Sequence, residues 1–86
     1  MNDIENLPAT FASNLYKTIG KNVSRIRKEK KISQLKLAYA LGYKSVSPIS
    51  SAEIYYNRIH FNVEQLAKIA YVLECNICDF FQDIPE

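Results

Sequence analysis

The sequence has 86 residues, of which 48% are hydrophobic and 23% are charged. This length and composition supply one small hydrophobic core and exclude both a second domain and an intrinsically disordered chain. No apolar run approaches the roughly 20 residues needed to span a bilayer, and the acidic N-terminus lacks the basic start and apolar segment of a signal peptide. We therefore expect a cytoplasmic globular protein without a membrane partner.

The formal net charge of +2 conceals a strong asymmetry along the chain. Residues 17–44 carry nine basic side chains and one acidic side chain, whereas residues 45–86 carry two basic and six acidic side chains. Such a concentration of positive charge is typical of proteins that bind nucleic acids or other polyanions. A solvated helix face would have the same composition, so charge alone leaves both interpretations open.

The hydrophobic pattern predicts helices after an N-terminal arm of residues 1–10. Apolar residues that recur every four positions from Phe11 to Ile26 predict an amphipathic helix ending near Lys30. Gly20 interrupts this stripe at a cost of about 1 kcal/mol relative to alanine. The sequence therefore favours one continuous helix here without deciding it.

Further helix signals follow along the chain. Ser33 is a good N-cap for a short helix that Gly42 would end, and Asn62 with Gln65 has the spacing of a capping box. A last short apolar stretch lies near the C-terminus, and no segment alternates with the period of a strand. We therefore expect an all-α domain over residues 11–86, built as a compact bundle of about five helices.

The segment GYKSVSPISSAE, residues 42–53, contains four serines and one proline. This composition is typical of a surface loop. The segment lies between two stretches with helical patterns, so its composition and its position suggest different structures.

Several motifs resemble one family in order and spacing. Residues 33–42, SQLKLAYALG, resemble the second helix of the Cro/repressor-type (XRE-like, lambda-repressor-like) helix-turn-helix proteins, whose pattern is Ser/Thr-Gln, two variable residues, Leu-Ala, three more and Gly. IGKNVSRIRKEK resembles the first helix, with an arginine seven residues before Gln34. Residues 49–53 match Ile-Ser-x-x-Glu, and LAKIAYVLECNICDFF resembles the fourth and fifth helices. The resemblance covers roughly residues 15–82.

The resemblance implies a sequence-specific transcriptional regulator of bacterial, phage or plasmid origin, most simply a repressor. Its partner would be double-stranded DNA, bound by a homodimer at a roughly palindromic operator. Residues 45–54 would form the recognition helix in the major groove, with Ser45 as its cap and Ile49 and Ala52 pointing inward. Pro48 would lie in the first turn, where a proline loses no hydrogen bond.

The resemblance also assigns roles to single residues. The base-facing positions are Val46, Ser47, Ser51 and Gln34. The phosphate-contacting positions are Lys44, Ser45, Ser50, Tyr56, Asn57 and Arg58. Serine discriminates between bases less well than arginine, glutamine or asparagine, so we expect either modest direct specificity or a reliance on DNA shape and water.

The sequence departs from the family pattern at two places. The loop IYYNRIHF is slightly longer than usual and lacks the glycine that commonly follows Glu53, and its residues Tyr55 and Tyr56 could pack on the core or on a dimer partner instead of touching DNA. Glu74 stands where the family commonly has glycine, so we expect strain or a different conformation at that helix end.

Two further sets of residues have expected structural roles. Arg27 and Glu53 match an ion pair that joins the first and third helices in some family members, although Glu53 could also be a solvated acid. The expected dimer surface consists of Ile77, Phe80 and Phe81. The N-terminal helix with Phe11 and Leu15 is the alternative dimer surface.

Cys75 and Cys78 form a C-x-x-C motif, which can bind metal or carry out redox chemistry. A zinc site needs about four ligands and the sequence has no second pair, so we expect structural thiols, with a zinc ion between two subunits as the alternative. No catalytic set and no Walker loop is recognisable, so we expect neither an enzyme, nor a cofactor, nor a small-molecule ligand. The alternative function is a protein-interaction module of the same fold, antitoxin-like or an anti-repressor partner, without DNA readout.

Overall fold

All regular elements are helical in the computed structural model, which describes residues 1–84. Four α-helices and three short 3-10 helices follow one another as η1 (Ile4–Asn6), α1 (Phe11–Glu29), α2 (Gln34–Ala40), α3 (Ser47–Glu53), η2 (Tyr56–Arg58), α4 (Val63–Leu73) and η3 (Ile77–Phe81). Residues 1–84 contain no strand, which confirms the all-α expectation. None of the helices in this range is long and apolar enough to cross a bilayer.

In the described residues the number of α-helices is four and not about five, because the last expected helix is the short 3-10 helix η3. The side chain of Asn76 accepts a hydrogen bond from the amide of Cys78, and the carboxylate of Asp79 accepts one from the amide of Asn76. The backbone is extended again at Gln82, with φ −67° and ψ 145°. A segment that is capped and then leaves the helix after five residues is too short for a sustained α-helical hydrogen-bond ladder.

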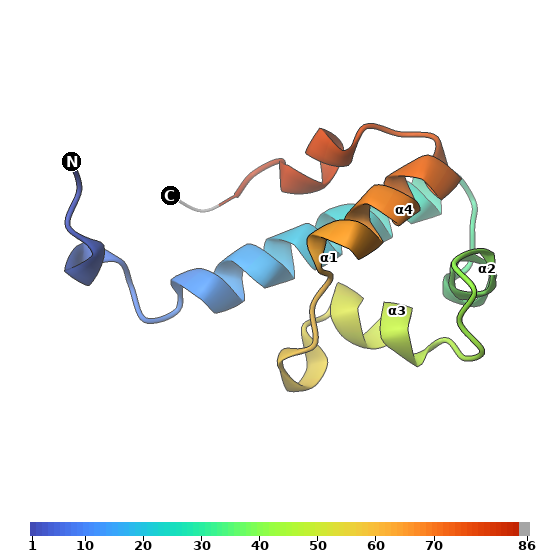
Figure 1. The fold of residues 1–86 in the computed structure, drawn as a ribbon, viewed down its shortest axis with the longest axis horizontal. Coiled ribbons are helices and arrows are strands. Elements are labelled where there is room, and N and C mark those ends of the chain that lie inside the picture. The colour runs from blue at the N-terminus through green and yellow to red at the C-terminus, as the bar shows by residue number, and fades with distance from the viewer. Residues whose placement is uncertain (85–86) are drawn as a thin grey trace.

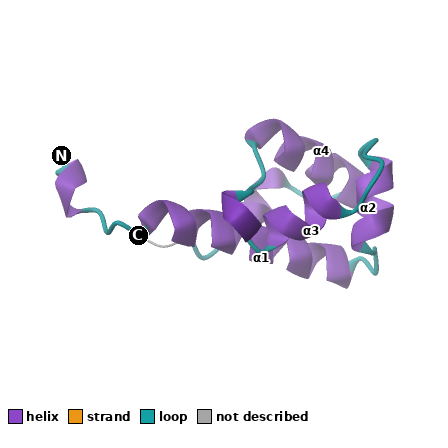
Figure 2. Cartoon of the chain, turned by 90° about the horizontal axis from the view of Figure 1, so that it is seen from below, coloured by secondary structure: helices purple, strands orange, loops and turns teal. Residues whose placement is uncertain are grey.

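The long helix α1 organises the bundle, as Figure 1 shows. It packs against α3 and η3, whereas α2 packs against α3 and α4. The N-terminal residues 1–10 are all exposed, and the segment that carries η1 extends beyond the bundle in both views (Figures 1 and 2). The two short helices α2 and α3 therefore pack against each other, with α1 against α3 and α4 against α2.

Helix α1 runs without a break through Gly20, which is buried. A Cβ atom at this position would meet the backbone carbonyl oxygens of Ala52 and Glu53 at the end of α3. The glycine is therefore a point of close helix–helix approach, and its helix-propensity penalty is offset by the contact between the two backbones.

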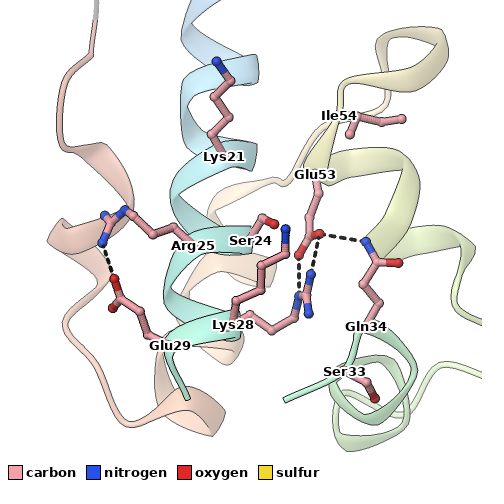
Figure 3. Close-up of a pocket in the computed structure, with 10 residues that line it drawn as sticks. Lys21, Ser24, Arg25, Lys28, Glu29, Ser33, Gln34, Glu53 and Ile54 are labelled. Carbon is pink, nitrogen blue, oxygen red and sulfur yellow. Dashed lines mark hydrogen bonds and ion pairs between the residues drawn. The ribbon is translucent and has the colours of Figure 1, made fainter. Parts of the chain in front are cut away.

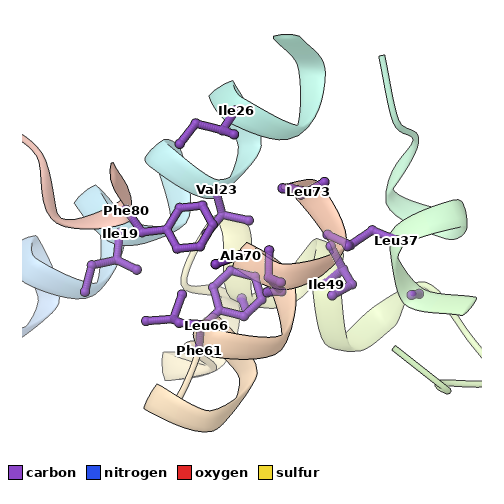
Figure 4. Packing of buried hydrophobic residues seen from close by; sticks show 13 residues of the cluster. Ile19, Val23, Ile26, Leu37, Ile49, Phe61, Leu66, Ala70, Leu73 and Phe80 are labelled. Carbon is purple, nitrogen blue, oxygen red and sulfur yellow. The ribbon is translucent and has the colours of Figure 1, made fainter. Parts of the chain in front are cut away.

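The core draws on all four α-helices, on Phe61 in the loop before α4 and on η3 (Figure 4). Its members are Ile19, Val23, Ile26, Leu37, Ala38, Ile49, Ala52, Phe61, Leu66, Ile69, Ala70, Leu73 and Phe80. Ile49 and Ala52 point inward from α3, as expected. This packing holds α3 by one side and leaves its other side free of core contacts.

The prediction that Phe80 belongs to a dimer surface is wrong, because its side chain is completely buried. Asn22 is buried in α1, and its side-chain Nδ2 donates hydrogen bonds to the backbone carbonyls of Phe80 and Gln82 at 2.9 and 2.8 Å. These bonds hold η3 against the bundle, so the phenyl ring closes the core of its own chain. Ile77 is half-buried against the same core, and Phe81 is exposed.

The connection from α2 to α3 is defined by backbone geometry. Gly42 has φ +86°, in the left-handed region that favours glycine, and the amide of Tyr43 donates to the carbonyl of Ala38. Helix α3 begins at Ser47, and its N-cap residue is Val46, so the prediction that Ser45 caps the helix is wrong. The physical reason is that the chain is already in a helical conformation at Val46, whose carbonyl accepts the first hydrogen bonds of α3.

Candidate nucleic-acid interface

The outward side of α3 and its N-cap residue carry the three serines and the valine that the sequence predicted there. Ser47 is exposed, whereas Val46, Ser50 and Ser51 are half-buried. Pro48 lies in the first turn of α3, where a backbone N–H has no partner within the helix, so the proline costs no hydrogen bond. The helix therefore presents short side chains on a surface that the core does not use.

Glu53, the last residue of α3, is the centre of a buried network that we call the Glu53 hub, formed with Arg27 and Gln34. Figure 3 shows Glu53 and Gln34 within it. Arg27 donates from Nε to Oε2 at 2.8 Å and from Nη2 to Oε1 at 3.1 Å. Gln34 donates from Nε2 to Oε1 at 2.8 Å. The Nη1 group of Arg27 donates to the backbone carbonyl of Ile32 at 2.8 Å.

The Glu53 hub joins the first three α-helices at one carboxylate. Glu53 is only 4% exposed, which rules out the alternative of a solvated acid, and the expected contact with Arg27 is present. Removing two charges from water is unfavourable unless their hydrogen bonds are all made, and here the fork of Arg27 is matched to both carboxylate oxygens. The hub therefore ties the end of α3 to α1 and to the start of α2.

Gln34, the first residue of α2, was expected to face DNA bases and to brace the recognition helix. Its amide nitrogen is engaged by Glu53, so the side chain does brace α3. The side chain of Gln34 is half-buried, and its second polar atom is the amide carbonyl oxygen, which can accept a hydrogen bond. Ser33 immediately before it accepts a hydrogen bond from the amide of Lys36, which is the N-cap predicted for α2.

A row of cations along α1 borders this region; these residues belong to the basic segment 17–44 but had no individual role predicted for them. Lys17, Lys21 and Lys28 share one face of α1, because positions i, i+4 and i+11 recur at the helical period. We call these three residues the lysine stripe, which extends over about 16 Å at 1.5 Å per residue. All three are exposed. The helical spacing of the lysines is the signal from which sequence reasoning could have found them.

Two lysines of the lysine stripe border an open groove of about 1050 Å³ between α1, the start of α2 and the end of α3 (Figure 3). Lys21 and Lys28 line it from α1, Gln34 from α2 and Glu53 from α3. Lys17 and Lys21 line a smaller adjoining groove of about 370 Å³. The cations of α1 therefore lie beside the start of α2 and the end of α3, and not on a separate surface.

The loop between α3 and α4 contains the residues expected to contact phosphates. Tyr56, Asn57 and Arg58 are all exposed. Tyr55 instead stacks on Tyr16 of α1, with ring centroids 5.8 Å apart. The structure thus separates the two tyrosines: Tyr55 packs on its own chain and Tyr56 faces solvent.

Lys44 and Ser45 in the α2–α3 turn are exposed, so both side chains are accessible beside the start of α3.

The end of α4 also matches its expectation, because Glu74 adopts the left-handed conformation, with φ 56° and ψ 48°, at the position where glycine is usual.

Cys75 and Cys78 are free thiols, half-buried and exposed respectively. Burial raises the pKa of the Cys75 thiol and the nearby Asp79 raises it further, while Lys30 acts in the opposite direction. A raised pKa keeps the group protonated at neutral pH, and metals bind the thiolate. Within residues 1–84 no cluster of three or more potential metal-ligating side chains is formed.

Comparison of the chain with protein-family models and with curated proteins gives no match.

Proposed function

We propose that this protein is a DNA-binding transcriptional regulator in which α3 enters the major groove. The observation that carries the proposal is the one-sided attachment of α3, which is fixed by Ile49, Ala52 and the Glu53 hub. A short helix that is held rigidly from behind and leaves its outer side accessible has the form needed for groove recognition.

The charge around α3 supports the same proposal. Lys44 precedes the helix, Arg58 follows it in the loop, and Lys21 and Lys28 line the groove beside it. Cations on several sides of a reading helix would contact the phosphates of both DNA strands and fix the helix in register.

The outer side of α3 limits how the proposed regulator would read sequence. Ser47 and Ser51 can donate or accept a hydrogen bond without distinguishing bases well, and Val46 can contact a thymine methyl group. Specificity would then come from DNA shape, from bridging water and from pairing two copies on half-sites about one helical turn apart. A homodimer is therefore part of the proposal, with the exposed Phe81 and not Phe80 available to the partner copy.

The experiment that tests the proposal is a titration of random-sequence duplex DNA by fluorescence anisotropy between about 50 and 200 mM salt. We expect binding at low salt that weakens steeply as the salt concentration rises, since each neutralised phosphate contributes about −0.9 to the slope of log K against log salt. Selection of bound sequences from a random library would then reveal the half-sites and their spacing. No binding even at low salt would contradict the proposal and would leave the protein-interaction module as the better function.

A further inference from the structure

The loop between α3 and α4 has a backbone that its sequence does not favour. Tyr55, Asn57 and Arg58 have φ values of 59°, 51° and 63°, all in the left-handed region. Asparagine tolerates this region, but tyrosine and arginine adopt it rarely because Cβ approaches the carbonyl oxygen. Three such residues within four positions persist only where surrounding interactions hold them.

His60 supplies two of these interactions. Its ring stacks on Tyr16 of α1, with centroids 3.7 Å apart and an interplanar angle of 18°. Its Nδ1 lies 2.9 Å from the backbone carbonyl oxygen of Arg58. Because a carbonyl oxygen can only accept, Nδ1 carries a proton and donates. His60 thus connects the left-handed Arg58 to α1.

Tyr16 is the common partner of this aromatic cluster. Tyr55 also stacks on it, with an interplanar angle of 20°, and the rings of Tyr55 and His60 lie 6.1 Å apart. One side chain of α1 therefore holds the loop at both of its ends, on either side of the exposed residues Tyr56, Asn57 and Arg58. Such contacts would order the loop before any ligand arrives.

We propose that Tyr16 is a positioning residue for DNA binding, which holds the loop so that Asn57 and Arg58 meet the phosphate backbone. This inference rests on the proposed function, and Tyr16 itself contacts no DNA in it. A loop that is ordered in advance loses less conformational freedom on binding, so it contributes more to affinity. Because phosphates carry no sequence information, the contribution is the same for every duplex.

The test compares four variants of the full chain. Tyr16→Ala removes the common stacking partner of Tyr55 and His60. His60→Ala lies in the exposed loop and does not touch the core; it removes the stack on Tyr16 and the hydrogen bond to Arg58 but leaves the Tyr16–Tyr55 stack. Tyr16→Phe keeps the ring, and Tyr71→Ala is the matched control, since Tyr71 on α4 is 85% exposed. Two quantities are measured for each variant, the salt-dependent affinity for random-sequence duplex DNA and the hydrogen-exchange rates of single backbone amides by NMR.

We expect Tyr16→Ala and His60→Ala to accelerate exchange of the Arg58 and Ile59 amides, which donate to the carbonyls of Tyr55 and Tyr56 at 3.2 and 2.9 Å. Exchange of α4 amides should change much less. Affinity should fall by about 2- to 10-fold, the range that corresponds to one aromatic pair, and the salt slope should decrease by about one phosphate contact. Tyr16→Phe and Tyr71→Ala should resemble the wild type in both measurements.

Three outcomes would overturn the inference. If the loop amides exchange no faster in Tyr16→Ala and His60→Ala than in Tyr71→Ala, the cluster does not hold the loop. If the loop amides exchange faster while affinity is unchanged, Tyr16 holds the loop without positioning it for DNA. If the wild type itself binds no duplex, the proposed function fails and the positioning role fails with it, whereas the first two outcomes leave the proposed function intact.

Discussion

Gly20 of α1 lies directly against the backbone carbonyl of Glu53 at the end of α3, with no space for a side chain between them. The same glutamate accepts hydrogen bonds from Arg27 and Gln34. The backbone and the side chain of one residue therefore fix α3 to α1, the first by steric fit and the second by charge.

Gly20→Ala is expected to destabilise the protein, although alanine is the better helix former by about 1 kcal/mol. The new methyl group would meet the backbone carbonyls of Ala52 and Glu53, which cannot rotate away as a side chain could. We expect a net loss of about 1–3 kcal/mol in urea denaturation, as for other overpacked interiors. Lys17→Ala on the exposed face of α1 should stay within about 0.5 kcal/mol of the wild type. A stabilised Gly20→Ala variant would show that helix propensity dominates at this position.

Breaking the Glu53 hub on one side is expected to be more harmful than removing both charges. Arg27→Met or Glu53→Leu leaves one buried charge without its partner, and each should lower the free energy of unfolding by about 3–5 kcal/mol. The double variant leaves no unpaired charge between these two residues, so its loss should be clearly smaller than the sum of the two single losses. Additive losses in the double-mutant cycle would mean that the pair is not energetically coupled.

Glu74→Gly is expected to stabilise the protein, because Glu74 holds a left-handed conformation that glycine adopts without penalty. Relief of that strain should contribute about 1 kcal/mol, measured as a higher midpoint of thermal unfolding. Ala67→Gly places glycine in the interior of the same helix, α4, and should lower stability by about 1 kcal/mol. If both variants shift the midpoint in the same direction, the left-handed position is not under strain.

Substitutions at the start of α3 are expected to separate affinity from sequence preference. Lys44→Ala removes a charge from the turn and should weaken binding by a similar factor for all duplexes, since phosphate contacts carry no sequence information. Ser51→Ala and Val46→Ala should alter the ranking of sequences selected from a random library, with each altered contact changing discrimination by about 1 kcal/mol or less. A uniform loss from all three variants would reject the assignment of the reading face.

Removal of charge from the lysine stripe is expected to reduce the salt dependence of DNA binding. The double variant Lys21→Ala and Lys28→Ala should lower the slope of log K against log salt by about two phosphate contacts. Lys68→Ala on α4 is the control, because this lysine is paired with Glu64 outside the groove, and its slope should match the wild type. Equal slopes in all variants would exclude α1 from the interface while leaving α3 in it.

Much of the local structure could be predicted from the sequence, because it depends on short-range chemistry. Ser33 caps α2, Asn62 and Gln65 form the expected capping box, and Gly42 ends α2 with a positive φ. Each of these features is determined by residues within a few positions of one another. The DNA-binding roles assigned to α3 and its flanks remain predictions.

The features that sequence reasoning missed depend on tertiary contacts. In the sequence, Gly20 interrupts the pattern of a helix, and only the structure shows that the carbonyl of Glu53 lies against it. Phe80 was predicted to lie in a dimer surface, and only the structure shows that Asn22 holds its backbone against the core. The Tyr16–His60 stack joins residues 44 positions apart, and no local pattern indicates it. Spacing along the chain cannot show such contacts, because they depend on how the helices pack.

The attachment of α3 has a consequence for how such a protein could diversify. The residues that hold the helix, Ile49, Ala52 and Glu53, are different from the residues that face outward, Ser47 and Ser51. A change of serine to arginine, glutamine or asparagine on the outer side would leave every anchoring contact in place. If α3 reads DNA as we propose, one or two such substitutions would therefore change the preferred sequence without disturbing the residues that hold the helix.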